Sequence, residues 1–209
     1  MEPKPASKGL DPRSFLSWPN FVTLLRLIAS LIFFTLAAIK SSPTLNFIGL
    51  GIHWAGDVVD GVLARRARQE TILGAEIDII ADRVESIFFY VNFLCFNPEL
   101  FLPIVLYLLD FAFVDFYLSY QFLKYPIISP NYFYLVDRRV YRYNFSPVAK
   151  FCNSTVVALL LIFLPQWQIL ATLFASGLII LKMRSIFWLR EKPGFLPPLS
   201  SGYQREAGP

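Results

Sequence analysis

The stretch "DVVDGVLARRARQETILGAEIDIIAD", residues 57–82, carries four aspartates, Asp57, Asp60, Asp78 and Asp82, in a chain that is otherwise mostly apolar. The first two aspartates are three residues apart and the last two are four apart, so on helices each pair projects from one face. A basic segment separates the two pairs. The spacing therefore predicts a helical hairpin whose carboxylates meet at one site inside a bundle.

The composition is that of a membrane protein. Of the 209 residues, 56% are hydrophobic and only 16% are charged, and the mean hydropathy is +0.52, values that exclude an ordinary soluble domain. Apolar runs close to the roughly 17–25 residues that a helix needs to cross a bilayer lie at about 21–39, 45–64, 77–96, 100–122, 148–164 and 167–188. Pro165 separates the last two runs, because proline disfavours helix just before it.

These runs predict an all-α, polytopic membrane protein with six transmembrane helices. We expect a six-helix domain over residues 19–190, a cytosolic N-terminal segment at 1–18, a basic, tyrosine-rich cytosolic loop at 123–147 and a mobile cytosolic tail at 191–209. Lys and Arg accumulate in cytosolic segments, and here they cluster at both ends of the chain and after the second and fourth runs. The site formed by the aspartates should therefore face the cytosol, beside anionic lipid heads. The chain has no basic stripe for nucleic acid.

The acids need compensation, because an ionisable residue at the centre of a span costs about 2.5–3.5 kcal/mol on insertion scales. Hard divalent cations such as Mg²⁺ or Mn²⁺ supply it, since they prefer oxygen ligands and substrate phosphates. Two such ions about 3.5–4 Å apart form a clamp used in phosphoryl displacement. A structural salt-bridge cluster with Arg65, Arg66 or Arg83 is the alternative. Gly61 and Gly74 would let a ligand approach the backbone.

Written out, Asp57-x-x-Asp60-Gly61-x-x-Ala64-Arg65, eight residues, Gly74-x-x-x-Asp78-x-x-x-Asp82, the segment resembles in every fixed position the signature of the CDP-alcohol phosphotransferase family. The six-run layout and the "PNFVTLLR" sequence at the start of the first run are also similar to the family. The resemblance implies a homodimeric membrane enzyme that transfers the phosphatidyl group of CDP-diacylglycerol to a small alcohol and releases CMP. Inositol, inositol phosphate and glycerol 3-phosphate are the favoured acceptors, and serine is a further one.

On the matching positions, the resemblance assigns a role to each signature residue. The four aspartates would hold two divalent ions, Mg²⁺ or Mn²⁺, and Asp82 would also serve as the general base. Gly61, Ala64, Arg65 and Gly74 would line the nucleotide and its pyrophosphate.

Polar residues outside the signature suggest further contacts. Asn20, Thr23 and Arg26 follow one another at intervals of three on the first helix and could contact cytidine or phosphate; a capping Asn and an Arg reaching the lipid heads explain them equally well. His53, one turn before Asp57, supports that ligand or is a packed histidine. Glu85, Asp110 and Asp115 are acceptor-pocket candidates or partners of arginines.

A basic group at the start of the fifth run offers ligands for a phosphorylated acceptor; its members are Arg138, Arg139, Arg142 and Lys150. Contact with lipid heads is the alternative explanation for the same residues.

Two other functions compete with this one. The family branch that uses CDP-choline or CDP-ethanolamine tends to be longer, with additional helices. A divalent-cation transporter or a non-catalytic scaffold belongs to another class, but a transporter needs polar residues along a path through the membrane, whereas the aspartates gather at one side.

The Lys/Arg distribution predicts which side of the membrane two segments occupy. Cysteines introduced at residue 68 and within residues 130–140 should react with an impermeant thiol reagent only from the cytosolic side. Labelling from the opposite side would invert the orientation.

Overall fold

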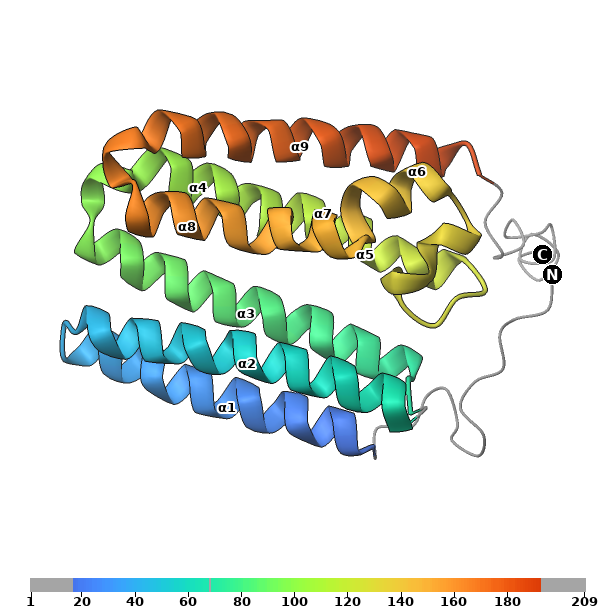
Figure 1. Ribbon diagram of the computed structural model, residues 1–209, viewed down its shortest axis with the longest axis horizontal. Coiled ribbons are helices and arrows are strands. Elements are labelled where there is room, and N and C mark those ends of the chain that lie inside the picture. The colour runs from blue at the N-terminus through green and yellow to red at the C-terminus, as the bar shows by residue number, and fades with distance from the viewer. Residues whose placement is uncertain (1–16, 68, 193–209) are drawn as a thin grey trace, which may run out of the picture.

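The computed structural model describes residues 17–67 and 69–192, apart from the side chain of Arg65. The predicted cytosolic segment at 1–18 and the tail at 191–209 therefore lie almost entirely outside the described part of the chain. Within that part every regular element is helical, which confirms the all-α class. The helices run side by side in one elongated bundle (Figure 1).

Three long helices make up the N-terminal half: α1 (Trp18–Ile39), α2 (Pro43–Ala67) and α3 (Ile72–Phe96). The C-terminal half contains α4 (Phe101–Leu109), α5 (Phe116–Tyr120), α6 (Arg138–Val140), α7 (Pro147–Phe151), α8 (Val157–Phe163) and α9 (Gln168–Arg190). Short 3₁₀ segments connect them at η1 (Pro98–Leu100), η3 (Gln121–Lys124), η4 (Pro130–Leu135) and η7 (Pro165–Trp167). Three π-helical segments, η2 (Asp110–Asp115), η5 (Tyr141–Phe145) and η6 (Cys152–Val156), interrupt the longer rods.

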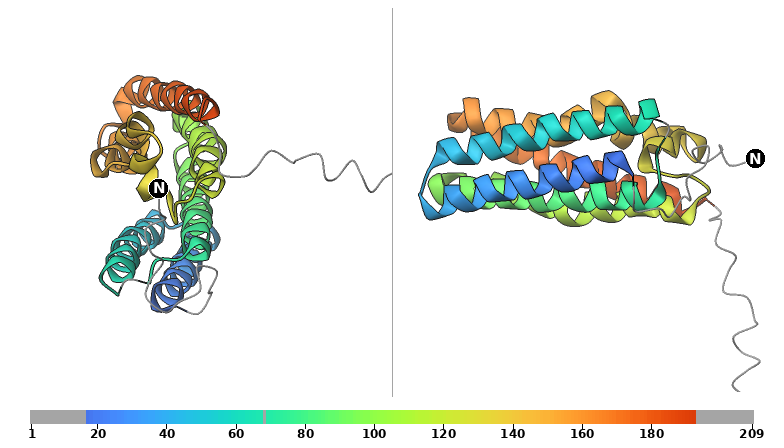
Figure 2. Two further views of the ribbon diagram at one scale, coloured as in Figure 1. Left: turned by 90° about the vertical axis from the view of Figure 1, so that its right-hand side faces the viewer. Right: turned by 90° about the horizontal axis from the view of Figure 1, so that it is seen from below.

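Among the described residues, five helical segments are long and apolar enough to cross a membrane: Trp18–Ile39, Pro43–Ala64, Pro98–Lys124, Arg138–Phe163 and Pro165–Arg190. They match five of the six predicted runs. The third run corresponds to α3, which has 25 residues but carries too many charged side chains to qualify by composition. In both views of Figure 2, α3 lies within the bundle, beside α1 and α2. That it forms a sixth span remains a proposal.

The expected loop at 123–147 is largely helical, and this part of the prediction was wrong. Asp137 caps α6, since its Oδ1 accepts hydrogen bonds from the backbone N–H of Arg139 at 2.8 Å and of Val140 at 3.2 Å. Partial burial raises the pKa of Asp137, but hydrogen bonds from Arg139, from the two amides and from Lys192 outweigh it and hold this pKa below its usual range. A capping carboxylate thus turns a basic segment into helix.

Glycines bring α1 and α2 unusually close together. Gly49 and Gly56 are seven residues apart, so both lie on the face of α2 that packs against α1. A Cβ atom at Gly49 would lie 2.6 Å from Cε1 of Phe34, and one at Gly56 would lie 2.3 Å from Cδ of Arg26. Small residues permit such close helix contacts in membranes. The contact at Gly56 lets the side chain of Arg26 cross α2 beside the aspartates.

The interior has two apolar clusters with a charged layer between them. One cluster surrounds Phe34, Phe89 and Tyr107, and the other surrounds Phe122 and Phe133. Along α3, η2 and α9, the chain passes from one cluster to the other through buried charged residues, which are Arg83, Glu85, Asp110, Asp115 and Lys182. Many large apolar side chains remain exposed on the outer faces of the helices, as lipid contact requires.

The C-terminal part of this layer is a closed ion network. Lys182 is fully buried and contacts Asp110 and, at 3.1 Å, Oδ1 of Asp115, while Asp115 also pairs with Arg83. Residues five apart lie on different faces of an α-helix, but a π-turn brings them together. The π-helical segment η2 therefore lets both aspartates meet one lysine.

Replacing Lys182 by Met should remove the cation from two buried carboxylates. Breaking a buried ion pair on one side costs about 3–5 kcal/mol, so we expect the free energy of unfolding in detergent to fall by about that amount. In the double variant Lys182→Met/Asp110→Asn, Arg83 still pairs with Asp115, and much of the loss should be recovered. A single variant as stable as the parent would contradict this role of Lys182.

Candidate active site

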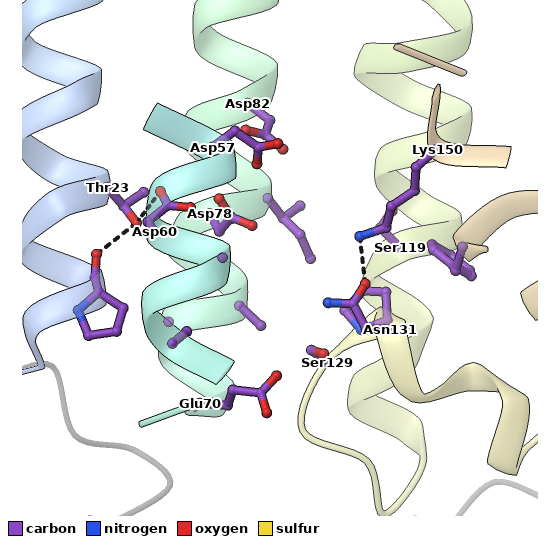
Figure 3. Close-up of a pocket in the computed structure, with 18 of the residues that line it drawn as sticks. Thr23, Asp57, Asp60, Glu70, Asp78, Asp82, Ser119, Ser129, Asn131 and Lys150 are labelled. Atoms are coloured by element: carbon purple, nitrogen blue, oxygen red, sulfur yellow. Dashed lines mark hydrogen bonds between the residues drawn. The ribbon is translucent and has the colours of Figure 1, made fainter. Parts of the chain in front are cut away.

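A pocket lies at the end of the bundle where α2 passes into α3, between the N-terminal helices and the α5–α7 region. One wall carries the four signature aspartates, as the hairpin prediction required (Figure 3). The facing wall carries neutral polar groups and one amine, contributed by Ser119, Ser129, Asn131 and Lys150. The pocket thus has an acidic side and a hydrogen-bonding side.

The acidic wall has the donor set of a divalent-cation site. One carboxylate oxygen from each of Asp57, Asp60 and Asp78 lies within 4.8 Å of the other two. Oδ1 of Asp78 is buried and has no hydrogen-bond partner, although the side chain as a whole is 40% exposed. Carboxylates that share such a small space without donors fit hard cations with oxygen ligands. The residues present therefore fit Mg²⁺ or Mn²⁺.

The cation that contacts these acids is Arg26. Its Nη2 lies 2.9 Å from Oδ1 of Asp82 and 3.6 Å from Oδ1 of Asp78, and its Nη1 lies 3.5 Å from Asp57 and 3.6 Å from Asp60. From the sequence we expected Arg26 to contact nucleotide or lipid, and its contacts with the four aspartates were not predicted. One signal could have indicated them: Arg26 is an arginine inside an apolar run, on a helix that packs against glycines of the helix that carries Asp57 and Asp60.

Of the arginines that the sequence offered for a structural salt-bridge cluster, Arg83 lines the pocket. Arg83 approaches Asp82 only to 3.9 Å, and its principal partner is Asp115. Arg66 is exposed, and the side chain of Arg65 lies outside the described part of the structure. Four carboxylates around one guanidinium leave an excess of negative charge, which a structural ion-pair cluster would not need.

The predicted nucleotide-lining residues come together at the pocket: Asn20, Thr23, Gly61, Ala64 and Gly74 all line it. Thr23 donates from Oγ1 to Oδ2 of Asp60 at 2.9 Å, so it orients that carboxylate. A Cβ atom at Gly74 would lie 2.6 Å from Oδ1 of Asn20, which explains the need for glycine there. These contacts join the start of α1 to α2 and to the start of α3.

The first turn of α3 faces the pocket. Thr71 caps the helix, accepting a hydrogen bond from the backbone N–H of Gly74 at 2.9 Å, and Thr71, Gly74 and Ala75 all line the pocket. The positive end of a helix dipole and its free N–H groups favour an anion such as phosphate. The position therefore suits the pyrophosphate of a nucleotide.

The acceptor candidates divide between two places. Lys150 lines the pocket, where its Nζ donates to Oδ1 of Asn131 at 2.5 Å. The other three basic candidates, Arg138, Arg139 and Arg142, are not among the lining residues, and Arg139 instead pairs with Asp137 and lies over Trp188. Asp110 is also absent from the lining and is held by Lys182.

Comparison with known proteins agrees with this geometry. A model of the CDP-alcohol phosphatidyltransferase family matches residues 16–187, which is most of the chain. Searches of curated proteins and of solved structures found no match. The chain therefore belongs to the CDP-alcohol phosphatidyltransferase family.

Proposed function

We propose that this protein transfers the phosphatidyl group of CDP-diacylglycerol to the hydroxyl of a small polar alcohol and releases CMP. Membership of the family indicates transfer of a phospholipid head group. The observation that carries the finer proposal is that all four signature aspartates face one pocket beside the first turn of α3. An acidic wall for metal and a helix N-terminus for phosphate are the two features that a CDP-linked donor requires.

The donor binds along the acidic wall. Asp57, Asp60, Asp78 and Asp82 hold two ions of Mg²⁺ or Mn²⁺, which when bound neutralise the pyrophosphate and stabilise the departing CMP. Gly61, Ala64 and Gly74 allow the nucleotide to approach the backbone, and Asn20 and Thr23 border the same space. Arg65 contributes a charge to the phosphates, as its place in the signature suggests.

Asp82 removes the proton from the acceptor. It lines the pocket together with the other three signature aspartates and lies one turn of α3 after Asp78. The acceptor oxygen attacks the phosphorus that carries diacylglycerol, and its proton passes to Asp82. The bond from that phosphorus to the oxygen of CMP breaks, and CMP leaves with the electron pair.

The polar wall binds the acceptor. Ser119, Ser129 and Asn131 offer hydroxyl and amide groups to a polyhydroxyl compound, and Lys150 offers a cation to a phosphate. Inositol, inositol phosphate and glycerol 3-phosphate are the acceptors that fit these groups best. A transporter is disfavoured, because Lys182 and Asp110 are fully buried, pair with each other and do not line the pocket, so the polar residues do not continue it as an open path.

The setting is an integral membrane protein with α3 as the sixth span. The basic segments place both termini and the pocket at the cytosolic face, where water-soluble acceptors arrive, while the lipid donor enters from the bilayer. Homodimer formation is part of the same proposal and rests on the family alone.

A direct assay tests the function. Purified protein should be incubated with CDP-diacylglycerol, Mn²⁺ or Mg²⁺ and each alcohol separately, with CMP and the lipid product measured. We expect CMP release only with the correct alcohol, loss of turnover in chelator and recovery on adding metal, because the acids alone repel the pyrophosphate. Full turnover in excess EDTA would contradict the metal centre, and no CMP release with any alcohol would contradict the reaction.

The variant Asp82→Asn tests the general base. The amide keeps the size and one oxygen ligand but cannot accept a proton, so turnover at saturating donor should fall about 10²–10⁴-fold. Binding of CDP-diacylglycerol, measured by titration, should change little.

Asp57→Asn is the matched control, since it alters a metal ligand of the same wall without a predicted role in proton transfer. It should weaken metal and nucleotide binding together with turnover. If Asp82→Asn instead keeps near-normal turnover, or fails only because donor binding collapses as in Asp57→Asn, the base is a different group.

A further inference from the structure

Arg26 contacts a fifth carboxylate, which lies outside the family signature. Glu85 on α3 is fully buried, and its Oε2 lies 3.3 Å from Nη2 of Arg26. The side chain of Arg26 is 2% exposed. One guanidinium therefore lies among five carboxylates, four facing the pocket and one behind them.

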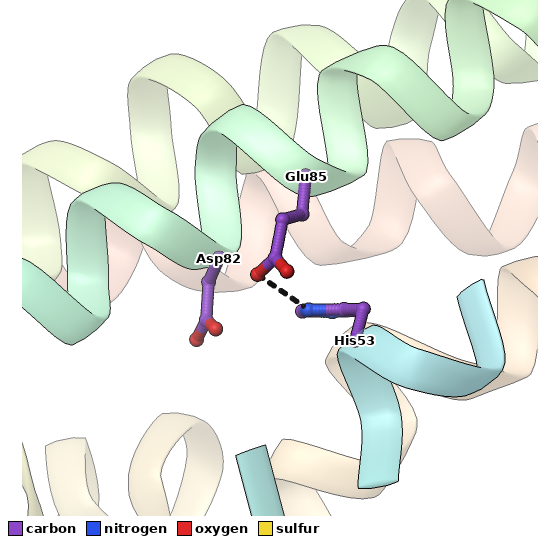
Figure 4. Close-up of side chains that lie close together, drawn as sticks. All are labelled: His53, Asp82 and Glu85. Carbon is purple, nitrogen blue, oxygen red and sulfur yellow. Dashed lines mark hydrogen bonds and ion pairs between the residues drawn. The ribbon is translucent and has the colours of Figure 1, made fainter. Parts of the chain in front are cut away.

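The surroundings hold this guanidinium in place. Glu85 accepts a hydrogen bond from Oγ of Ser30 at 2.5 Å. Figure 4 shows its contact with Nδ1 of His53, at 2.9 Å. The aliphatic part of Arg26 lies against Gly56, where a Cβ atom would approach its Cγ to 2.4 Å. Glu85 and Gly56 thus fix the two ends of the Arg26 side chain.

Arg26 acts on the aspartates mainly through its charge. Its Nε and Nη1 are buried and have no hydrogen-bond partner, which is costly for a guanidinium that served only to anchor two helices. Its contacts with Asp57, Asp60 and Asp78 are 3.5–3.6 Å long. A buried cation that is poorly hydrogen-bonded but surrounded by carboxylates sets the electrostatic balance of the site.

The charges of the site sum to zero when two divalent ions are included. With His53 neutral, the five ionised carboxylates carry five negative charges, and Arg26 together with two divalent ions carries five positive charges. Without Arg26, the same site loaded with two ions would keep a net negative charge and would repel a pyrophosphate. Neutrality before the donor arrives therefore depends on the arginine.

We propose that Arg26, held by Glu85 and Gly56, is a resident cation that limits metal affinity and makes the metal-loaded site receptive to the anionic donor. This inference rests on the proposed function, since it takes the divalent ions and a pyrophosphate as the ligands. Under this proposal, Arg26 is a residue outside the signature that favours binding of the metal ions first and of the nucleotide second.

The sign of each effect follows from charge. Arg26→Gln removes a cation, so the site should bind Mn²⁺ more tightly and CDP less tightly. Glu85→Gln removes an anion, so Mn²⁺ should bind less tightly and CDP more tightly. Charges about 4 Å apart in a partly buried site interact strongly, and we expect changes on the order of tenfold. The double variant Arg26→Gln/Glu85→Gln restores the balance, and both affinities should return toward those of the parent.

The experiment measures both ligands on the full chain in detergent. Mn²⁺ binding is followed by electron paramagnetic resonance and CDP binding by calorimetry at saturating Mn²⁺, with thermal unfolding to establish that each variant is folded. Arg26→Lys keeps the charge, so its affinities for Mn²⁺ and CDP should remain closer to those of the parent than the affinities of Arg26→Gln do. Gly56→Ala changes no charge but displaces the arginine, so it should weaken CDP binding.

Two results would overturn the inference and are distinguishable. In the first, the folded single variants bind both Mn²⁺ and CDP less tightly than the parent, and the double variant binds them less tightly than either single variant. Arg26 and Glu85 then have a purely structural role, and the proposed function is unaffected. If the parent chain itself binds no Mn²⁺, the metal centre of the proposed function fails and this inference fails with it.

Discussion

A carboxylate inside a membrane bundle must have a cation beside it, and this requirement organises the interior of the protein. The structure meets it in two ways. Around Lys182, two aspartates face one lysine and Arg83, so positive and negative charges are equal in number. Around Arg26, five carboxylates face one guanidinium. In the first group the charges are matched, whereas in the second the carboxylates outnumber the guanidinium.

The helix α3 belongs to both groups. Asp78, Asp82 and Glu85 face Arg26 of α1, while Arg83, the residue after Asp82, pairs with Asp115. Because successive positions on a helix point in different directions, neighbouring residues 82 and 83 enter different charge groups. This explains how a helix too polar to qualify as a span by composition can pack between apolar neighbours.

Much of the site was predictable because it depends on local spacing. The pairs at Asp57 and Asp60, and at Asp78 and Asp82, share helix faces whatever the rest of the fold does, and the turn between them brings the pairs together. The five apolar spans and the break at Pro165 likewise follow from composition and from the chemistry of proline. These features require no knowledge of how distant helices pack.

The remainder depends on packing between distant helices, which the periodicity of one helix does not contain. The contacts of Arg26 need α1 to cross α2 at Gly56, and those of Asp110 and Asp115 need a π-turn that departs from the usual period. Helix at residues 138–145 was missed because basic, tyrosine-rich sequence was taken as loop, although Asp137 is a capping residue at its start. The first two misses concern the direction in which a side chain points, and the third concerns a capping residue at the start of a helix.

The asymmetry of the pocket also constrains the reaction. The signature aspartates lie on the wall formed by α2 and α3, so the proposed function assigns the two phosphates of the donor and their cations to this wall. The facing wall offers Lys150 among neutral hydroxyl and amide groups, which suits an uncharged polyol or a compound with a single phosphate better than a second polyphosphate. Asp82 lines the pocket, and Arg83 approaches it to 3.9 Å. In the proposed reaction, Asp82 takes the proton of an acceptor bound at the facing wall, while the charge that develops on the leaving group appears beside the acidic wall, which would hold the cations.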